Sequence, residues 1–299
     1  MTQAALQNLS YADSTAPERE AGLMTSTGVQ GVGKTYQNMG VIARYVKDKL
    51  DIKVRGRKVL IFDTNGEYTQ EEFLKNGHQV AIKTIALSDV RAFAKSDLVE
   101  IRRIDAKHLG IPEKKAILDF LVRNWKNGLL VLEDINTYVL NILAMENVVG
   151  KIISLRHKAI DCLISYQSLR AVEPRIWQNS RWVRMHFQAD DVDDIKGKVT
   201  NPELYKIAQL MVNHRYLNAT KQNMGERFFV YITKFGRKLE GGFGKDEFMF
   251  ACKGYLNLNK KKVTDFMSIN EISQQEATKK LQDFYYRIYY DNPDRVEAA

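Results

Sequence analysis

The segment GVQGVGKT at residues 28–35 constrains this chain more than any other, because it matches the phosphate-binding pattern G-x-x-x-x-G-K-[ST]. Glycines let consecutive backbone N–H groups curl around one anion, and a helix that begins near Gly33 adds its positive N-terminal end. Lys34 can then reach the β- and γ-phosphates of a nucleotide, and the Thr35 hydroxyl can hold Mg²⁺. The residues that we expect to bind the nucleotide are Gly28, Gln30, Gly31, Val32, Gly33, Lys34, Thr35 and Tyr36.

The sequence around this loop supplies the strand–loop–helix order that phosphate binding requires. Residues 21–26 predict a strand before the loop. Residues 36–50 predict a helix after it, because apolar side chains recur at helical spacing. These side chains are Met39, Ile42, Ala43, Val46 and Leu50. An ordinary glycine-rich turn ahead of a helix could carry the same pattern, so the remaining motifs have to decide between the two interpretations.

Composition narrows the class of protein further. The 299 residues allow one large or two small domains, and a hydrophobic content of 44% is enough to bury a core. A formal charge of +9 suits a polyanionic partner without proving one. Cys162 and Cys252 lie far apart in apolar runs, which favours buried thiols over a disulfide or a zinc site. No apolar run has the length of a membrane span and the first residues lack a signal-peptide core, so we expect a cytoplasmic setting.

Strands and helices alternate as far as residue 190. Apolar runs that end in polar residues predict buried strands, and amphipathic segments between them predict helices. The predicted strands are residues 58–63, 80–85, 98–104, 129–132, 160–166 and 182–187. The predicted helices are residues 69–76, 112–127, 145–158 and 172–178. Such alternation is typical of an α/β fold with a mainly parallel sheet that helices cover on both faces.

The pattern changes after residue 190. An acidic cluster at 190–194 could be a metal site, although a solvated loop or a helix N-terminus explains it better. The predicted elements that follow are a helix at 201–218, antiparallel strands at 227–234 and 248–252, and a helix at 273–290.

These changes suggest three parts of the chain. Residues 1–20 are polar and predict an N-terminal arm. Residues 21–190 form the phosphate-binding core, and residues 191–299 form a C-terminal α+β extension with a helix, a β-hairpin and a terminal helix.

Two acidic residues, Glu133 and Asp134, follow the buried run at 129–132. A nucleotide hydrolase needs a carboxylate at the end of a strand beside the phosphate-binding loop. We expect Glu133 to hold Mg²⁺ together with Thr35, and Asp134 to orient or deprotonate the attacking water. The usual order is Asp followed by Glu or Asp, so the division of roles between the two stays open. A strand merely followed by acidic loop residues would give the same sequence.

Two further motifs carry a resemblance to a known superfamily. Residues 154–157 read Ser-Leu-Arg-His, and the strand at 160–166 after them ends at Gln167. Residues 63–68 read Asp-Thr-Asn-Gly-Glu-Tyr, which is similar to the D-x-x-G-E-Y that follows the second strand of HerA-like ATPases. With the loop and the acidic pair, these motifs make residues 20–190 resemble the HerA–FtsK superfamily of P-loop ATPases. The Arg-His pair looks most like virus and phage genome-packaging ATPases, and is also similar to zonula occludens toxin-like assembly ATPases of filamentous phages.

The resemblance implies a RecA-like core and a role for each matching residue. Gln167 matches the strand-end glutamine that senses the γ-phosphate, although an ordinary polar residue could also end this strand. Arg156 is the expected arginine finger, which one subunit inserts into the site of its neighbour to stabilise charge on the transferred phosphoryl group. Arg181 and Arg184 are rivals for that role, and a surface ion pair is the alternative for each arginine.

The function that the resemblance implies is an ATP-driven motor working as an oligomeric ring, expected to be a hexamer, with double-stranded DNA as its track. The DNA would be packaged into a virion or moved between compartments, in the host cytoplasm or on the virion, with capsid or vertex proteins as further partners. The glycine-rich segment 236–244 and the basic run 260–262 are expected to face DNA phosphates. Two other classes stay open: an ATPase that moves protein during phage assembly or secretion, and a nucleotide-binding switch without a motor.

Overall fold

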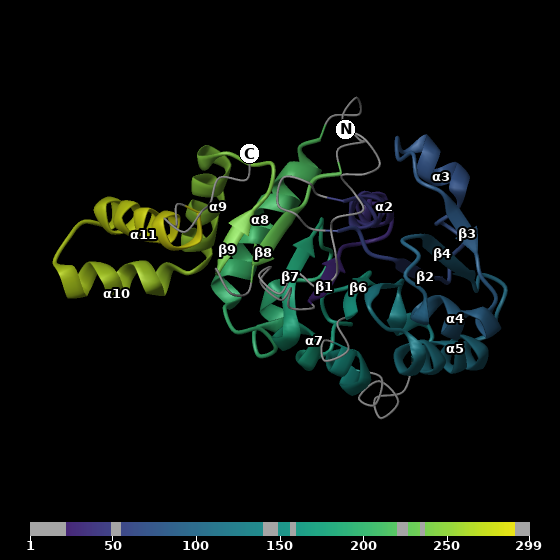
Figure 1. Cartoon of the computed structure of the whole chain (residues 1–299). Helices are drawn as coiled ribbons and strands as arrows, with labels where there is room; N and C mark the ends of the chain where they lie inside the picture. The colour runs from purple at the N-terminus through teal and green to yellow at the C-terminus, as the bar shows by residue number, and fades with distance from the viewer. Residues whose placement is uncertain are drawn as a thin grey trace, which may run out of the picture.

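Parallel pairing joins most strands of this protein into one sheet. The computed structural model describes residues 22–48, 55–139, 149–155, 160–219, 227–233 and 237–290. The strands in these ranges are β1 (Leu23–Thr27), β2 (Val59–Asp63), β3 (Ile82–Thr84), β4 (Ile101–Asp105), β5 (Gly128–Leu132), β6 (Ile160–Tyr166), β7 (Ser180–Met185), β8 (Val230–Thr233) and β9 (Lys238–Glu240). Their order is β3-β4-β2-β5-β6-β1-β7-β8-β9, as Figure 1 shows from right to left. Pairing is parallel from β3 to β7, and antiparallel for β7–β8 and β8–β9.

Helices cover both faces of this sheet. Those with defined bounds are α2 (Lys34–Tyr45), α3 (Gln70–Lys75), α4 (Val90–Lys95), α5 (Ile111–Asn124), α7 (Pro174–Asn179), α8 (Pro202–Leu217), α9 (Lys245–Leu258), α10 (Lys260–Asn270) and α11 (Gln274–Tyr289). In β2, Val59 and Ile61 belong to the same hydrophobic cluster as Ile42 of α2. Leu60 and Phe62 belong to a separate cluster that includes α5. Because side chains alternate between the faces of a strand, the continuous apolar run has partners on both sides, and the predicted α/β fold is confirmed.

The register of the parallel strands brings the chemically important segments to one edge of the sheet. Thr27 at the end of β1 pairs with Tyr166 at the end of β6, and Leu132 at the end of β5 pairs with Ile164. The glycine-rich loop, the acidic pair and Gln167 therefore all begin at the carboxyl ends of adjacent strands. In open α/β sheets this edge is where ligands bind.

The predicted strand at 248–252 is wrong, because these residues belong to α9. The buried side chains of α9 recur at helical spacing, and they are Phe248, Ala251, Cys252, Tyr255 and Leu256. Glu247 accepts the N–H of Gly244, the N-cap residue, at 3.2 Å at the start of the helix. The strand that pairs with β8 is instead β9, within the glycine-rich segment.

The C-terminal helices lie beyond the β9 edge of the sheet. The predicted helix at 273–290 is confirmed as α11, where Ser273 accepts the N–H of Glu276 at 3.3 Å as the N-cap. The basic run at 260–262 begins α10, which sequence reasoning did not predict. Figure 1 shows α10 and α11 side by side, projecting away from the strands. The expected arm at 1–20 lies outside the described residues.

Candidate functional site

Gly28 and Gly33 give the loop between β1 and α2 its shape. Gly28 has a φ of 154°, and a Cβ there would lie 2.8 Å from the Cβ of His186, so a side chain does not fit. Gly33 has a φ of 87° and is the N-cap of α2, where it brings no side chain to accept from the first N–H groups. These N–H groups and the positive end of the helix dipole suit an anion.

Lys34 is buried in the first turn of α2. Its Nζ donates to the carbonyl oxygens of Gly28 at 2.6 Å and Val29 at 2.8 Å. Burial lowers the pKa of Lys34, and the negative charges of Asp134 and Glu133 oppose that shift. The ammonium group therefore lies at the loop, within the field of the two acidic residues after β5.

Glu67 is a neighbour of the loop to which sequence reasoning gave no role. The Oγ1 of Thr35 donates to Oε2 of Glu67 at 2.6 Å. Glu67 stands in a turn after β2, where the Asp63 carboxylate accepts the N–H groups of Gly66 at 2.7 Å, Glu67 at 3.1 Å and Tyr68 at 3.0 Å. The D-x-x-G-E-Y motif could have pointed to Glu67. Its first acid, Asp63, builds the turn, and its second acid, Glu67, contacts the helix that follows the phosphate-binding loop.

Glu133 is anchored in the interior, with an exposed fraction of 2%. Its Oε1 accepts from Nδ2 of Asn38 at 2.8 Å, from Oγ of Ser165 at 3.3 Å and from the hydroxyl of Tyr68. Burial raises the pKa of Glu133 to about 7, while the hydrogen bond from Tyr68 acts to lower it. Among the hydrogen bonds of the described residues, none joins Glu133 to Thr35, its expected partner at the metal.

Asp134 and Gln167 are brought together, as their places after neighbouring strands predict. The Nε2 of Gln167 donates to Oδ2 of Asp134 at 2.7 Å, and Nδ2 of Asn65 lies 3.4 Å from the same oxygen. The other oxygen, Oδ1, is buried and has no hydrogen-bond partner among the described residues. Asp134 is also in the left-handed region, with a φ of 42°. A buried acceptor of this kind is suited to a water molecule or a metal-bound water.

The arginines expected to compete for the finger role differ in position. Arg184 is fully buried in its own subunit, where its Nη2 donates to Oδ1 of Asn38 and to Oγ of Ser26 at 3.1 Å. A side chain held in this way cannot enter a neighbour's site, so Arg184 is excluded as a trans finger. Arg181 is at the opposite end of β7 from the loop, with its guanidinium over the Trp182 ring. Arg156 lies outside the described residues.

A single cavity of about 480 Å³ connects these groups. It is lined by the loop and α2, by Glu67, by both acidic residues, by Gln167, and by Arg227 from the segment before β8. Its size is in the usual range for small-molecule sites. Sequence reasoning did not assign Arg227, which is far from the loop in the chain and reaches it because β8 joins the sheet.

The acidic cluster at 190–194 has partners inside the protein. Asp191 caps the short 3₁₀ helix Val192–Ile195 and pairs with Lys206, and Asp194 pairs with Arg170 at 2.6 Å. In the part of the chain that the structure describes, no group of three or more His, Cys, Asp and Glu side chains could hold a metal ion. The interpretation as a helix N-terminus is therefore the one that the structure supports.

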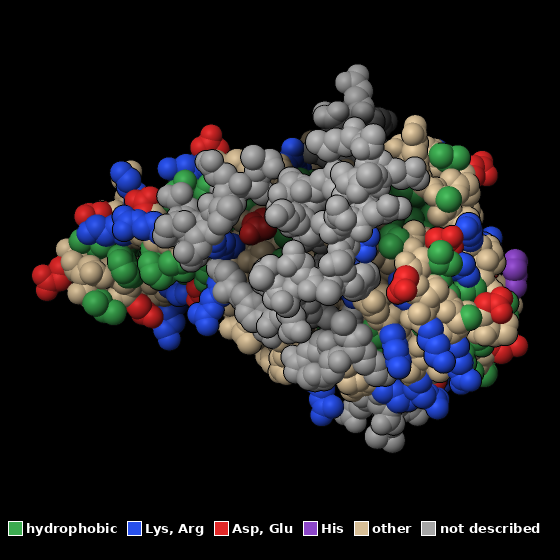
Figure 2. Space-filling model, in the orientation of Figure 1, with side chains coloured by type: hydrophobic (Ala, Val, Ile, Leu, Met, Phe, Trp, Pro, Cys, Tyr) green, Lys and Arg blue, Asp and Glu red, His purple; other side chains and the backbone are tan. Residues whose placement is uncertain are grey.

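Basic side chains are exposed on two surfaces. In the run at 260–262, Lys260 and Lys261 are exposed, whereas Lys262 pairs with Glu203 and donates to the Tyr285 hydroxyl at 2.9 Å. Figure 2 shows a second gathering of Lys and Arg over α4 and α5. The exposed basic residues of these two helices are Arg91, Lys95, Lys115 and Arg123.

The sheet order, with the glycine-rich loop between β1 and α2, is that of the RecA-like P-loop NTPase fold. Solved structures with a similar arrangement include the DNA-packaging ATPase B204 of Sulfolobus turreted icosahedral virus, at 14% identity and a TM-score of 0.44 over 73% of this chain and 95% of that chain. The conjugation coupling protein TcpA of pCW3 is similar at 11% identity, with a TM-score of 0.42, over 71% and 57% of the two chains.

A third similar structure is the N-terminal domain of zonular occludens toxin from Neisseria meningitidis, at 13% identity and a TM-score of 0.31 over 57% of this chain and 78% of that chain. No protein-family description and no curated protein matches the sequence. The described helices contain no segment that is both long and apolar enough to cross a membrane.

Proposed function

We propose that this protein hydrolyses ATP and uses the energy to move along double-stranded DNA. One observation carries the hydrolytic part: the glycine-rich loop, the acidic pair after β5 and Gln167 after β6 line one cavity. A phosphate cradle, an acid that can act on water and an amide at the γ-phosphate end are the parts that phosphoryl transfer to water requires.

Three residues of the cavity have proposed roles in hydrolysis. Lys34 leaves the two carbonyl oxygens that it now contacts and neutralises the β- and γ-phosphates. Asp134 orients or deprotonates the attacking water through its buried Oδ1, because its Oδ2 is already occupied by Gln167. Gln167 thereby links the γ-phosphate end of the cavity to the position of Asp134.

The oxygen donors at the same edge of the sheet are suited to Mg²⁺. Hard oxygen ligands suit Mg²⁺, and the cavity offers the hydroxyl of Thr35 with the carboxylates of Glu67 and Glu133. We assign the metal to Thr35 and Glu133, with Glu67 as the carboxylate in contact with Thr35. Bound Mg²⁺ would reduce the negative charge on the phosphate oxygens.

The DNA track is inferred from charge and resemblance. The formal charge of +9 favours a polyanion, and the motifs resemble those of DNA-moving ATPases. The proposed contacts with DNA phosphates are Lys260 and Lys261, the segment 237–244, and the basic surface of α4 and α5. Packaging of a viral genome, with capsid or vertex proteins as partners and a place in the host cytoplasm or on the virion, is the form of this activity that we propose.

A ring is proposed because a trans arginine needs a neighbouring subunit. Arg156, just before β6, is the proposed finger, and a hexamer is the expected assembly. ATP hydrolysis measured with and without double-stranded DNA, together with the native mass, tests the proposal. We expect DNA to stimulate turnover by a ring. A rate of ATP hydrolysis that does not depend on DNA would favour an ATPase that moves protein. A monomer that hydrolyses ATP slowly would favour a nucleotide-binding switch.

A further inference from the structure

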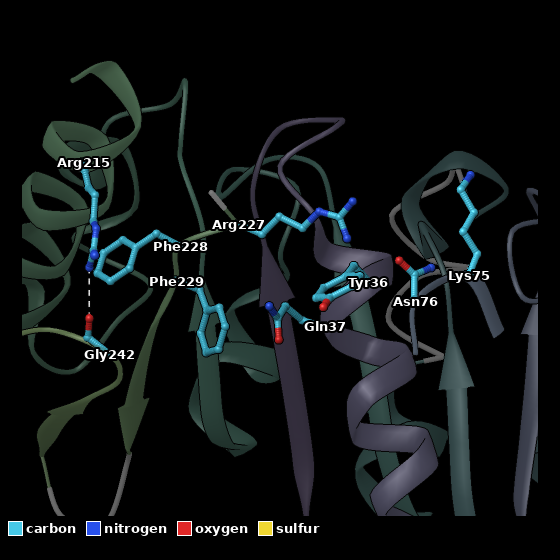
Figure 3. A pocket seen from close by; sticks show the side chains of 9 residues that line it. All are labelled: Tyr36, Gln37, Lys75, Asn76, Arg215, Arg227, Phe228, Phe229 and Gly242. Carbon is cyan, nitrogen blue, oxygen red and sulfur yellow. Dashed lines mark hydrogen bonds between the residues drawn. The ribbon is translucent and has the colours of Figure 1, made fainter. Parts of the chain in front are cut away.

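A second cavity, of about 670 Å³, adjoins the first at the N-terminal end of α2 (Figure 3). Four residues line both cavities: Tyr36, Lys75, Asn76 and Arg227. The second cavity extends from them towards Phe228 and the segment before β8. The two cavities are therefore adjacent parts of one larger site, and the proposed catalytic residues line only the first.

Two of the residues that line both cavities, Tyr36 and Arg227, form a cation–π stack. The guanidinium carbon of Arg227 lies 4.0 Å from the centre of the Tyr36 ring, and Figure 3 shows the guanidinium close above that ring. A Cβ at Gly33 would lie 2.6 to 2.8 Å from the side-chain carbons of Arg227, so the glycine allows this approach. Arg227 is exposed, and no carboxylate of the described residues pairs with it. The stack thus holds a cation and a flat surface beside the phosphate cradle.

The direction of a bound nucleotide follows from which residues line each cavity. The γ-phosphate end faces Asp134 and Gln167, which line the first cavity and are absent from the second. The backbone of a phosphate-binding loop cradles the α- and β-phosphates, so the sugar and base leave from the end opposite the γ-phosphate. In this protein the second cavity is at that opposite end, beyond Tyr36.

We propose that the second cavity binds the nucleobase and ribose of the nucleoside triphosphate, with the base lying against the Tyr36–Arg227 pair. This inference rests on the proposed function. Bases stack on aromatic rings and on guanidinium planes, and both surfaces are present. The amides of Gln37 and Asn76 add donors and acceptors that can meet the polar edge of a base.

The alternative role for Arg227 is to bind phosphate as a simple positive charge. The two roles make different demands on the side chains. Stacking requires the ring of Tyr36 and the planar guanidinium, whereas phosphate binding requires only a cation and would survive a change to lysine. Binding of a ligand that has phosphates but no base distinguishes the two roles.

The experiment measures calorimetric affinities for ATP and for inorganic tripolyphosphate, both with Mg²⁺, in four full-length proteins: the wild type, Tyr36→Ala, Tyr36→Phe and Arg227→Lys. We expect Tyr36→Ala to weaken ATP binding on the order of 5- to 100-fold, the range that loss of one stacking contact gives. Tripolyphosphate affinity should stay within about twofold of wild type, because the loop is intact. Tyr36→Phe keeps the ring and should restore ATP affinity, and Arg227→Lys should weaken ATP binding selectively.

Two results would overturn the inference. Equal losses of ATP and tripolyphosphate affinity in Tyr36→Ala, or full ATP affinity in Arg227→Lys, would mean that these residues serve the phosphates or the fold rather than the base. Because tripolyphosphate binding needs a folded loop, it also reports whether each variant is intact. A wild-type protein that binds neither ligand would instead refute the proposed function itself, and the base site with it.

Discussion

The side-chain amide of Gln167 donates a 2.7 Å hydrogen bond to Oδ2 of Asp134. This contact joins the ends of two adjacent parallel strands. It leaves Oδ1 of Asp134, a residue that lines the cavity, as a buried acceptor with no partner among the described residues. An amide that contacts the γ-phosphate would therefore also position the acid that acts on water. We therefore propose that Gln167 and Asp134 act together in hydrolysis.

Asp134→Asn should keep Mg-ATP bound and lose turnover. Asparagine can preserve the contact with Gln167, but it is neither an anion nor a base for the attacking water. Loss of general base catalysis typically lowers a rate about 10²- to 10⁴-fold. Single-turnover hydrolysis and equilibrium ATP binding measure the two effects. If Glu133→Gln alone traps bound ATP while Asp134→Asn turns over, the roles of the two acids are reversed.

Gln167→Ala should lower turnover while Mg-ATP remains bound. The variant removes both the amide at the γ-phosphate and the group that holds Asp134. If the two residues act through one contact, the double variant with Asp134→Asn should be little worse than Asp134→Asn alone. Rate losses that multiply in the double variant would show that the hydrogen bond has no part in catalysis.

Lys34→Ala should abolish hydrolysis and weaken ATP binding, because the β- and γ-phosphates lose their cation. Lys47, an exposed residue just after α2, provides a matched control as Lys47→Ala. Steady-state hydrolysis and nucleotide binding are measured for both. Turnover by Lys34→Ala equal to that of the control would rule out the assigned site.

Glu133 predicts a specific pH dependence of stability in the metal-free protein. Burial raises the pKa of Glu133 from 4.5 to about 7, so the folded state holds this proton more tightly than the unfolded state. The stabilisation that protonated Glu133 gives to the folded state is fully present below pH 4.5, and it is lost as the pH rises to 7. Relative to Glu133→Gln, which stays neutral, the wild type should lose about 3 kcal/mol across this window. Denaturant unfolding of both proteins measures the difference, and parallel pH profiles would contradict the shifted pKa.

Arg184→Ala should lower the free energy of unfolding, because the Arg184 side chain is buried. The variant leaves Oδ1 of Asn38 without its buried donor and opens a cavity beside α2. A buried acceptor left without its donor costs about 1–3 kcal/mol. Arg175, exposed on α7, is the control, and Arg175→Ala should change stability by less than about 0.5 kcal/mol. A stable Arg184→Ala protein with slow hydrolysis would contradict this structural role.

The sequence was sufficient to predict the segments whose chemistry and pattern are local. The strand and the helix on either side of the loop, the strand at 160–166 and the terminal helix are confirmed, and each was predicted from a local residue pattern. The strand predicted at 248–252 was wrong because a short apolar run fits a helix or a strand equally well, and packing decides between them.

Contacts between distant segments could not be predicted from the sequence. Arg227 reaches the loop through the antiparallel addition of β8 to the sheet, and no nearby residue signals this. The burial of Arg184 depends on which face of β7 it occupies, and one residue of register would reverse it. Glu67 was in a motif, yet its contact with Thr35 required the turn that Asp63 builds.

Mixed rings test whether Arg156 acts across subunits. Arg156→Ala should still bind ATP and assemble, and should hydrolyse ATP roughly 10³- to 10⁵-fold more slowly, whereas loss of a surface ion pair would cost at most about 1 kcal/mol. Lys34→Ala subunits retain Arg156, so mixing them with Arg156→Ala subunits should restore part of the activity. Mixed rings that remain as inactive as the separate variants would exclude Arg156 as the finger and direct the same test to Arg181.

Displacement of a third DNA strand tests the central claim most directly. A triplex-forming oligonucleotide bound to double-stranded DNA is released when a motor passes along the duplex. We predict ATP-dependent release by the wild type and none by Asp134→Asn, although the variant should still bind ATP. Rapid ATP hydrolysis by the wild type that leaves the oligonucleotide in place would contradict translocation along DNA.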